Sequence, residues 1–367
     1  MNIRSLVIAL LLPGMLVGCS GQKDITPTDQ PDSANAELEL ISAVDASYYP
    51  LISSANHTFY GPEGEEVDFI QSLVDIGVNT VRVRVWHDPV GNASSLSEVS
   101  EFSRLVKSAG LKLWVTPHYS DTWADPGAQN PPVAWSGLDY VNVRDKVYEH
   151  TANITATLNP DFIQIGNEVN NGFLFPHGNI HHNKTQFMEL LQIGSKAVRD
   201  TSVHARIMIH YAGLELATPF FENLTSVDYD IAGISYYPFW HGKSIQRVGE
   251  TLQEIAAETN KDVIIAETAY PFTLGWNDWT HNIIGSEDQI ILPEYPASPQ
   301  GQLDFVSELK QEVLDVQRGL GFCYWGAEMV SWDGPESSKG SSWENQAIFD
   351  FDSRLLPVAG AFGFESS

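Results

Sequence analysis

The sequence contains little cysteine and little positive charge. Only two of its 367 residues are cysteines, Cys19 and Cys323, so a fold that depends on several disulfide bonds is excluded. Lys and Arg number 20 against 47 Asp and Glu, which gives a formal net charge of −27. Such a chain is not expected to bind nucleic acid or an anionic membrane surface through its charge, and it suits a protein that acts on a neutral ligand.

Long apolar runs are also missing. The N-terminal run from residue 5 to 17 follows the cation Arg4 and is too short to span a bilayer, so it is typical of a signal peptide. The segment LVGC at residues 16–19 resembles a bacterial lipobox, in which the cysteine is lipidated after cleavage. The alternative is an ordinary signal peptide with an incidental cysteine.

This reading predicts three segments. They are a lipoprotein signal peptide over residues 1–18, a lipid-anchored flexible tether over 19–38, and a folded domain over 39–367. The tether is polar and contains proline. Cys19 would carry the lipid, and the absence of Asp directly after it favours the outer membrane, or cell surface, over the inner membrane. The domain would then keep a single thiol, Cys323, which we expect to be buried.

Eight apolar, strand-like runs recur from about residue 39 onward, and amphipathic helical stretches separate them. The helical stretches include 64–77, 96–110 and 241–259. Eight such units predict a single (β/α)₈ TIM barrel. A doubly wound open sheet is the alternative, but no Gly-rich phosphate motif follows the first run. The predicted strands cover residues 41–49, 80–86, 112–119, 162–168, 206–212, 231–238, 263–269 and 321–328.

The ends of these strands carry an unusual concentration of aromatic, cationic and acidic side chains. In a barrel of this class the carboxyl ends of the strands form the active site. Glu168 ends the fourth run and Glu267 ends the seventh, so both should point into one cleft. Two facing carboxylates can serve as acid and nucleophile in glycoside hydrolysis, and a retaining enzyme needs them about 5–5.5 Å apart. A structural carboxylate paired with an arginine is the alternative for either one alone.

The strings around these residues resemble glycoside hydrolase family 53, the endo-β-1,4-galactanases. The resemblance covers essentially all of residues 41–360, in order. The strings WADPG, YYPFWHG and SWENQA are the most specific, whereas Asn-Glu followed by a later Glu is shared by the whole clan A of glycoside hydrolases. The matching segments are RVRVWHDP (82–89), HYSDTWADPGAQNPPVAW (118–135), GNEVNNG (166–172), ISYYPFWHG (234–242), ETAYPFT (267–273) and SWENQAIFDF (342–351).

The resemblance implies that Glu168 is the general acid/base and Glu267 the nucleophile. Asn167 would then hydrogen-bond the sugar 2-hydroxyl. We expect Arg84 to face into the barrel near Glu267 and keep it ionised.

Other residues of the predicted rim suit sugar binding. A tyrosine hydroxyl could donate to Glu267, from Tyr237 or, if the register is shifted by one, from Tyr236. Indole faces suit the apolar side of a pyranose ring, whereas carboxylates and imidazoles suit its hydroxyl groups. The predicted set is Trp86, Trp123, Trp240 and Trp325 for stacking, with His118, Asp121, Asp125 and His241 for hydrogen bonds.

The sequence predicts no cofactor and no metal. The loop from residue 274 to 296 lacks the dense acidic pattern of a calcium loop. Asp278, His281 and Asn282 could supply ligands there, but a loop without structural Ca²⁺ is favoured.

We therefore predict a monomeric, retaining endo-β-1,4-galactanase that acts on pectic galactan or type I arabinogalactan and contacts membrane only through its lipid. Two alternatives remain open. One is another clan A endo-β-glycanase, such as a mannanase or xylanase. The other is a non-catalytic, surface-tethered glycan-binding lipoprotein.

Overall fold

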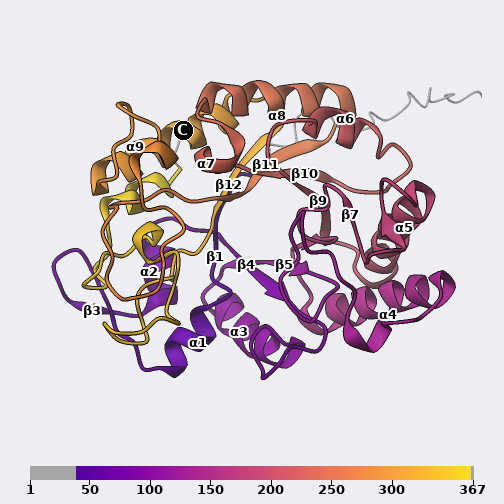
Figure 1. Cartoon of the computed structure of the whole chain (residues 1–367), viewed down its shortest axis with the longest axis horizontal. Helices are drawn as coiled ribbons and strands as arrows, with labels where there is room; N and C mark the ends of the chain where they lie inside the picture. Colours follow the sequence, from indigo (N-terminus) through magenta and orange to yellow (C-terminus); the bar gives the residue numbers. More distant parts are fainter. Residues whose placement is uncertain (1–38, 365–367) are drawn as a thin grey trace, which may run out of the picture. The chain divides into compact units, whose positions relative to one another are not determined.

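A computed structural model describes residues 39–364 of the chain. The predicted signal peptide, Cys19 and the tether lie outside the described residues. Eight parallel strands close into a barrel in the order β1-β12-β11-β10-β9-β6-β5-β4, which confirms the predicted fold (Figure 1). The strands are β1 (Ile41–Asp45), β4 (Thr80–Val85), β5 (Lys112–Pro117), β6 (Phe162–Gln164), β9 (Arg206–Ala212), β10 (Ile231–Ser235), β11 (Asp262–Thr268) and β12 (Gly319–Tyr324).

Alternation along each strand separates two apolar layers. On β4, Val81, Val83 and Val85 pack outward in the large core between barrel and helices. A second, smaller cluster fills the barrel interior and includes Trp114, Phe162 and Cys323. Cys323 is fully buried, as its apolar surroundings in the sequence predict.

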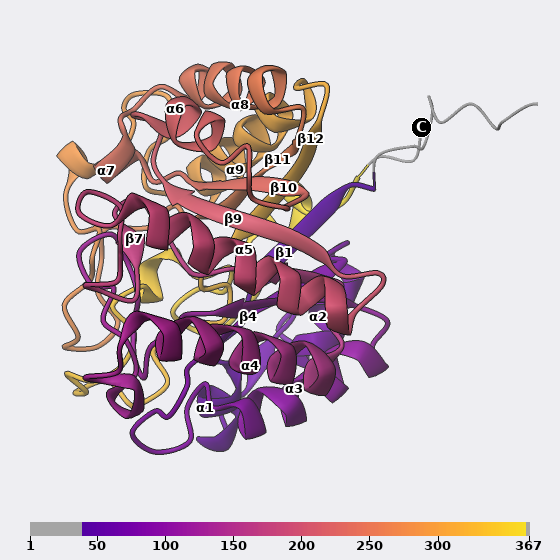
Figure 2. The ribbon, with the colours of Figure 1, turned by 90° about the vertical axis from the view of Figure 1, so that its right-hand side faces the viewer.

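Helices form a ring outside the strands, and Figure 2 shows α3, α4 and α5 side by side along one flank. Ser95 caps α3 by accepting the Glu98 N–H, and Asn159 and Asn260 end α4 and α8 in the left-handed conformation. The helices are α1 (Tyr49–Ser54), α2 (Phe69–Asp75), α3 (Leu96–Ser108), α4 (Tyr140–Leu158), α5 (Lys184–Thr201), α6 (Ala217–Glu222), α7 (Pro238–His241), α8 (Ile245–Thr259) and α9 (Pro299–Leu314).

Several element boundaries differ from the sequence-based ones. The helix expected from residue 64 begins only at Phe69, because Asp68 is its N-cap and Glu66–Val67 pairs as strand β3 with β2 (Phe59–Tyr60). The helix expected over 241–259 begins only at Ile245 as α8, and His241 instead ends the short helix α7. A second small hairpin, β7 (Gly172–Phe173) with β8 (Gly178–Asn179), follows β6.

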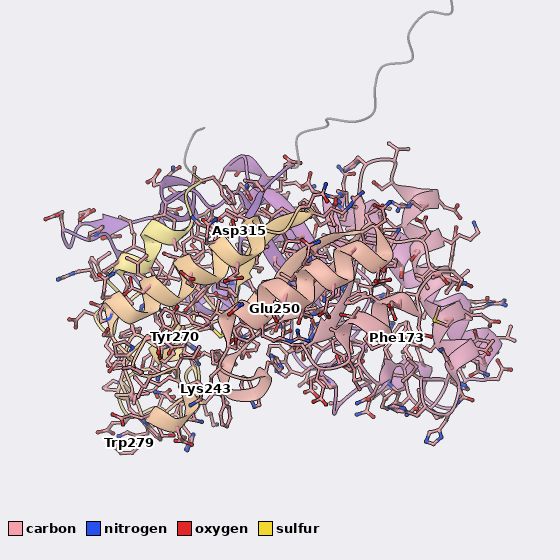
Figure 3. All side chains as sticks on the ribbon, turned by 90° about the horizontal axis from the view of Figure 1, so that it is seen from above. Phe173, Lys243, Glu250, Tyr270, Trp279 and Asp315 are labelled. Atoms are coloured by element: carbon pink, nitrogen blue, oxygen red, sulfur yellow. The ribbon has the colours of Figure 1, made fainter. Side chains whose placement is uncertain are left out.

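The loops that follow the barrel strands gather on one face of the domain, which we call the mouth. In Figure 3, Lys243 and Trp279 lie along the lower edge of the view, whereas Asp315, just after α9, lies toward the upper side. Lys243 follows β10 and Trp279 follows β11, so the lower edge is the mouth. None of the helices within residues 39–364 combines the length and the apolar composition that a membrane-spanning helix needs.

Candidate active site

Arg82 of β4 lies at the centre of the mouth and is almost fully buried. Its Nη1 lies 2.8 Å from Oδ2 of Asp45 on β1, and its Nη2 lies 2.8 Å from Oε1 of Glu267 on β11. Nη2 also donates to Oδ1 of Asn167 at 2.8 Å. One guanidinium therefore links β4 to three other parts of the barrel. Burial lowers its pKa, but the two carboxylates outweigh this and raise it.

A bulge in β11 turns Glu267 toward Arg82. Ile264 and Ala266 already point into the barrel, so strict alternation would turn the next residue outward. The register with β10 shifts between the pairs Ile234–Ile265 and Ser235–Glu267, which leaves one extra residue on β11. Glu267 consequently also faces the interior, where a bulge next to a site commonly re-aims a side chain.

The segment after β6 presents Glu168 through an uncommon backbone conformation. Gly166 has φ +77°, and Glu168 itself has φ +47°, in the left-handed region that non-glycine residues avoid. Such a conformation costs about 1–3 kcal/mol and is typical of functional sites. A Cβ at Gly166 would lie 2.7 Å from the Val169 side chain, so this turn requires glycine.

A short relay of hydrogen bonds holds the Glu168 carboxylate. Oε1 accepts from the Ser235 hydroxyl at 2.6 Å, and Ser235 Oγ lies 2.8 Å from Nε2 of His210. The single hydroxyl hydrogen of Ser235 goes to Glu168, so Nε2 of His210 donates to Ser235 Oγ, and Nδ1 accepts the Glu168 N–H at 3.4 Å. Burial lowers the pKa of His210 well below its usual value, and the ring is neutral. Neither Ser235 nor His210 was anticipated from the sequence.

The two carboxylates have different electrostatic surroundings. Burial, followed by the charge of Glu267, raises the pKa of Glu168 to about 8, although the Ser235 hydroxyl opposes the shift. Burial also raises the pKa of Glu267, but Arg82 opposes this directly at 2.8 Å. Of the two glutamates, only Glu267 contacts Arg82. Glu267 is therefore the one that loses its proton first, and Glu168 keeps its proton.

Tyr237 is the tyrosine that contacts the pair. Its hydroxyl donates to Oε2 of Glu267 at 3.1 Å. Tyr236 instead points outward from the barrel, where it donates to the carbonyl of Gly242 at 2.9 Å and stacks on Phe305 of α9. The structure thus decides the register that the sequence left open.

Arg84 does not contact Glu267, and the expectation that placed it there is wrong. Arg82 and Arg84 share the inward face of β4, but the layer of Glu267 is that of Arg82. The Arg84 guanidinium carbon lies 4.3 Å from the ring centres of Tyr48 and Trp123 and 4.8 Å from that of Trp86. Arg84 therefore supports the aromatic wall of the site.

The predicted histidines stabilise loops. Nδ1 of His118 accepts from the Trp86 indole and from the Ala124 N–H, each at 3.2 Å. Burial, with Arg84 and Arg82, lowers the pKa of His118 well below its usual range. Nδ1 of His241 accepts from the Tyr237 N–H, and burial lowers its pKa to about 4. Both rings are neutral near pH 7.

The two predicted aspartates lie in different places. Asp121 accepts N–H bonds from Asp88 at 3.0 Å and Val133 at 2.7 Å, so it ties two loops together. Asp125 accepts from the Gly127 N–H and lines the cleft above the carboxylate pair.

A cleft of about 610 Å³ contains both glutamates. Trp343 of the SWENQA string also lines the cleft, although it was not singled out from the sequence. Its place as an aromatic residue in the loop after the last strand is the signal that could have identified it. Arg84, His118, Trp86, Asp121 and Tyr236 do not line the cleft. The predicted residues that line it are Trp123, Asp125, Asn167, Glu168, Tyr237, Trp240, His241, Glu267 and Trp325.

The residues considered for calcium have other partners. Asp278 accepts from the Thr280 N–H and the Ser331 hydroxyl, Asn282 donates to Glu344, and the ring of His281 packs against Trp276. Among the described residues there is no group of three or more His, Cys, Asp or Glu side chains that could hold a metal ion.

Comparison with known proteins identifies the family of the chain. The model of glycosyl hydrolase family 53 matches residues 41–362. An arabinogalactan endo-β-1,4-galactanase of Cellvibrio japonicus is 35% identical over 329 residues, which is 83% of this chain and 85% of that protein. An endo-β-1,4-galactanase of Bacillus subtilis is 29% identical over 90% of this chain and 86% of its own length.

Solved structures agree with this placement. The GH53 catalytic domain of Ignisphaera aggregans superposes with a TM-score of 0.84 at 36% identity, over 88% of this chain and 95% of that one. A fungal β-1,4-galactanase structure gives a TM-score of 0.78 at 27% identity, over 88% and 99%. With the family model matching nearly the whole barrel and two glutamates in one cleft, the chain belongs to glycosyl hydrolase family 53 and is a glycoside hydrolase.

Proposed function

We propose that the protein is an endo-β-1,4-galactanase that hydrolyses the β-1,4-galactan of pectin or type I arabinogalactan with retention of configuration. The observation that carries the proposal is the unequal pair in the cleft, where Arg82 contacts Glu267 and leaves Glu168 to hold a proton. The substrate class is supported by the galactanases among the relatives.

In the first step Glu168 protonates the glycosidic oxygen while Glu267 attacks the anomeric carbon. The bond from that carbon to the departing sugar breaks, and a glycosyl ester forms on Glu267. Asn167 is oriented to bond the 2-hydroxyl of the same sugar. Its Oδ1 accepts from Arg82, and its Nδ2 donates one hydrogen to the Ala124 carbonyl at 2.9 Å, which leaves the second N–H for substrate.

In the second step the ester removes the negative charge of Glu267. The negative charge of Glu267 then no longer raises the pKa of Glu168. Glu168, which lost its proton in the first step, can take a proton from water. That water attacks the anomeric carbon and releases the sugar with the starting β configuration. The mechanism uses only protein groups and water.

Location is a separate proposal, supported by the first twenty residues alone. We infer that the signal peptide ends at Gly18, that Cys19 is lipidated, and that the exported protein is held at the outer membrane through residues 19–38.

The substrate proposal predicts a selective activity. Purified protein incubated with linear β-1,4-galactan, mannan, xylan and cellulose should release oligosaccharides from galactan, and proton NMR should detect the β-anomer first. Glu267→Gln serves as the inactive control. Activity confined to another polymer would contradict the substrate, and an initial α-anomer would contradict retention.

The charge asymmetry predicts a pH dependence. Activity needs protonated Glu168, so the rate should fall as the pH rises through about 8. In Glu168→Ala this alkaline fall should disappear on an aryl galactobioside, whose leaving group needs little protonation. Azide should restore the second step and give a product of retained configuration.

In Ser235→Ala the alkaline fall in rate should move to higher pH, because the Ser235 hydroxyl stabilises the Glu168 anion. A downward shift would show that Ser235 does not act this way.

The lipid proposal predicts the fate of a single substitution. In the bacterial host the wild type should fractionate with membranes and incorporate labelled fatty acid. Cys19→Ser should abolish the fatty-acid label. The variant should either appear in the soluble fraction or remain as an unprocessed precursor. A control substitution at Ser20 should leave both the label and the membrane fractionation unchanged. A wild type that is soluble and unlabelled would refute lipidation.

A further inference from the structure

Strongly exposed aromatic side chains are confined to one region of the domain. Within residues 39–364 they are Phe239, Trp240, Trp276 and Trp279, the first two in α7 after β10 and the other two in the loop after β11. Trp276 is 48% and Trp279 is 65% exposed, yet neither lines the catalytic cleft. Exposed aliphatic residues, by contrast, also lie on the helical flank, as Leu105 of α3 does. Aromatic surface gathered in this way marks a binding surface.

The loop that carries both tryptophans is held by buried polar groups. Glu344 accepts from the Asn277 N–H at 2.7 Å and from the Asn282 side chain at 3.3 Å. Asp278 is 4% exposed and bonds Ser331 at 3.0 Å. Because these bonds fix the loop, presenting the two indoles to a ligand requires little further ordering.

This loop adjoins the cleft through the loop after β12. The Trp279 N–H donates to the Ser337 carbonyl at 2.9 Å, and the Gly340 N–H donates to Thr280 at 2.8 Å. Gly340 lines a second hollow of about 200 Å³, which shares three tryptophans with the cleft. Those shared residues are Trp123, Trp325 and Trp343.

We propose that Trp276 and Trp279 form an outer binding surface for the same neutral β-galactan chain, beyond the sugars held in the cleft. The inference rests on the proposed function. The hollow shares three tryptophans with the cleft, and its Gly340 is bonded to Thr280 of the loop that carries Trp276 and Trp279. Figure 3 shows Trp279 at the mouth edge, where a long chain would leave. Flat indole faces suit sugar rings, and the net charge of −27 suits a neutral polymer.

The surface should matter for long chains only. Trp276→Ala, Trp279→Ala and the double variant should raise KM on long galactan roughly 2- to 10-fold at unchanged kcat, the scale of lost aromatic contacts. On an aryl galactobioside, which is too short to leave the cleft, kcat/KM should equal that of the wild type. Trp279→Phe should retain most of the affinity, and Leu105→Ala serves as the exposed apolar control.

The outcomes separate this inference from the proposed function. If the wild type cleaves galactan and the double variant has the same KM on the polymer, the outer surface is refuted while the galactanase activity stands. If KM rises equally on the short substrate, the tryptophans support the cleft instead. A wild-type dimer in analytical ultracentrifugation that the double variant dissociates would assign the surface to a second copy of the chain and overturn the inference.

Discussion

The ion pairs of Arg82 with Asp45 and Glu267 are the interaction on which the rest of the site depends. The guanidinium is buried, and its partners come from β1, β11 and the end of β6. Buried charges are tolerated only when they are paired and hydrogen-bonded, and removal of one partner leaves the others uncompensated. Side chains from several strands therefore gather around this cation, and Arg82 sets the positions of Glu267 and Asn167.

The same cation makes two otherwise similar residues chemically different. Both glutamates end apolar strands, and burial raises the pKa of each. Arg82 contacts Glu267, whereas Glu168 has only the Ser235 hydroxyl on its carboxylate. The bulge in β11 and the left-handed conformation of Glu168 are the local backbone distortions that bring the two side chains into one cleft.

Much of this architecture could be predicted from sequence, because strands and strand ends have strong local signals. The eight apolar runs became the eight barrel strands, and the position of both glutamates in one cleft followed from the topology. Alternation predicted which residues of β4 face the barrel interior, but not which of them lies level with Glu267. The contact with Glu267 was therefore predicted for Arg84, whereas Arg82 makes it. The Ser235 and His210 relay was missed because it depends on long-range packing that no single strand shows.

Covalent trapping tests the division of roles most directly. A 2-fluoro galactobioside with a good leaving group forms the glycosyl ester but hydrolyses slowly, because fluorine destabilises the positive charge of the transition state. Peptide mass spectrometry of the inactivated wild type should find one fluoroglycosyl group on Glu267, the carboxylate that Arg82 keeps ionised. A label on Glu168, or no covalent adduct on a protein that cleaves galactan, would contradict the account.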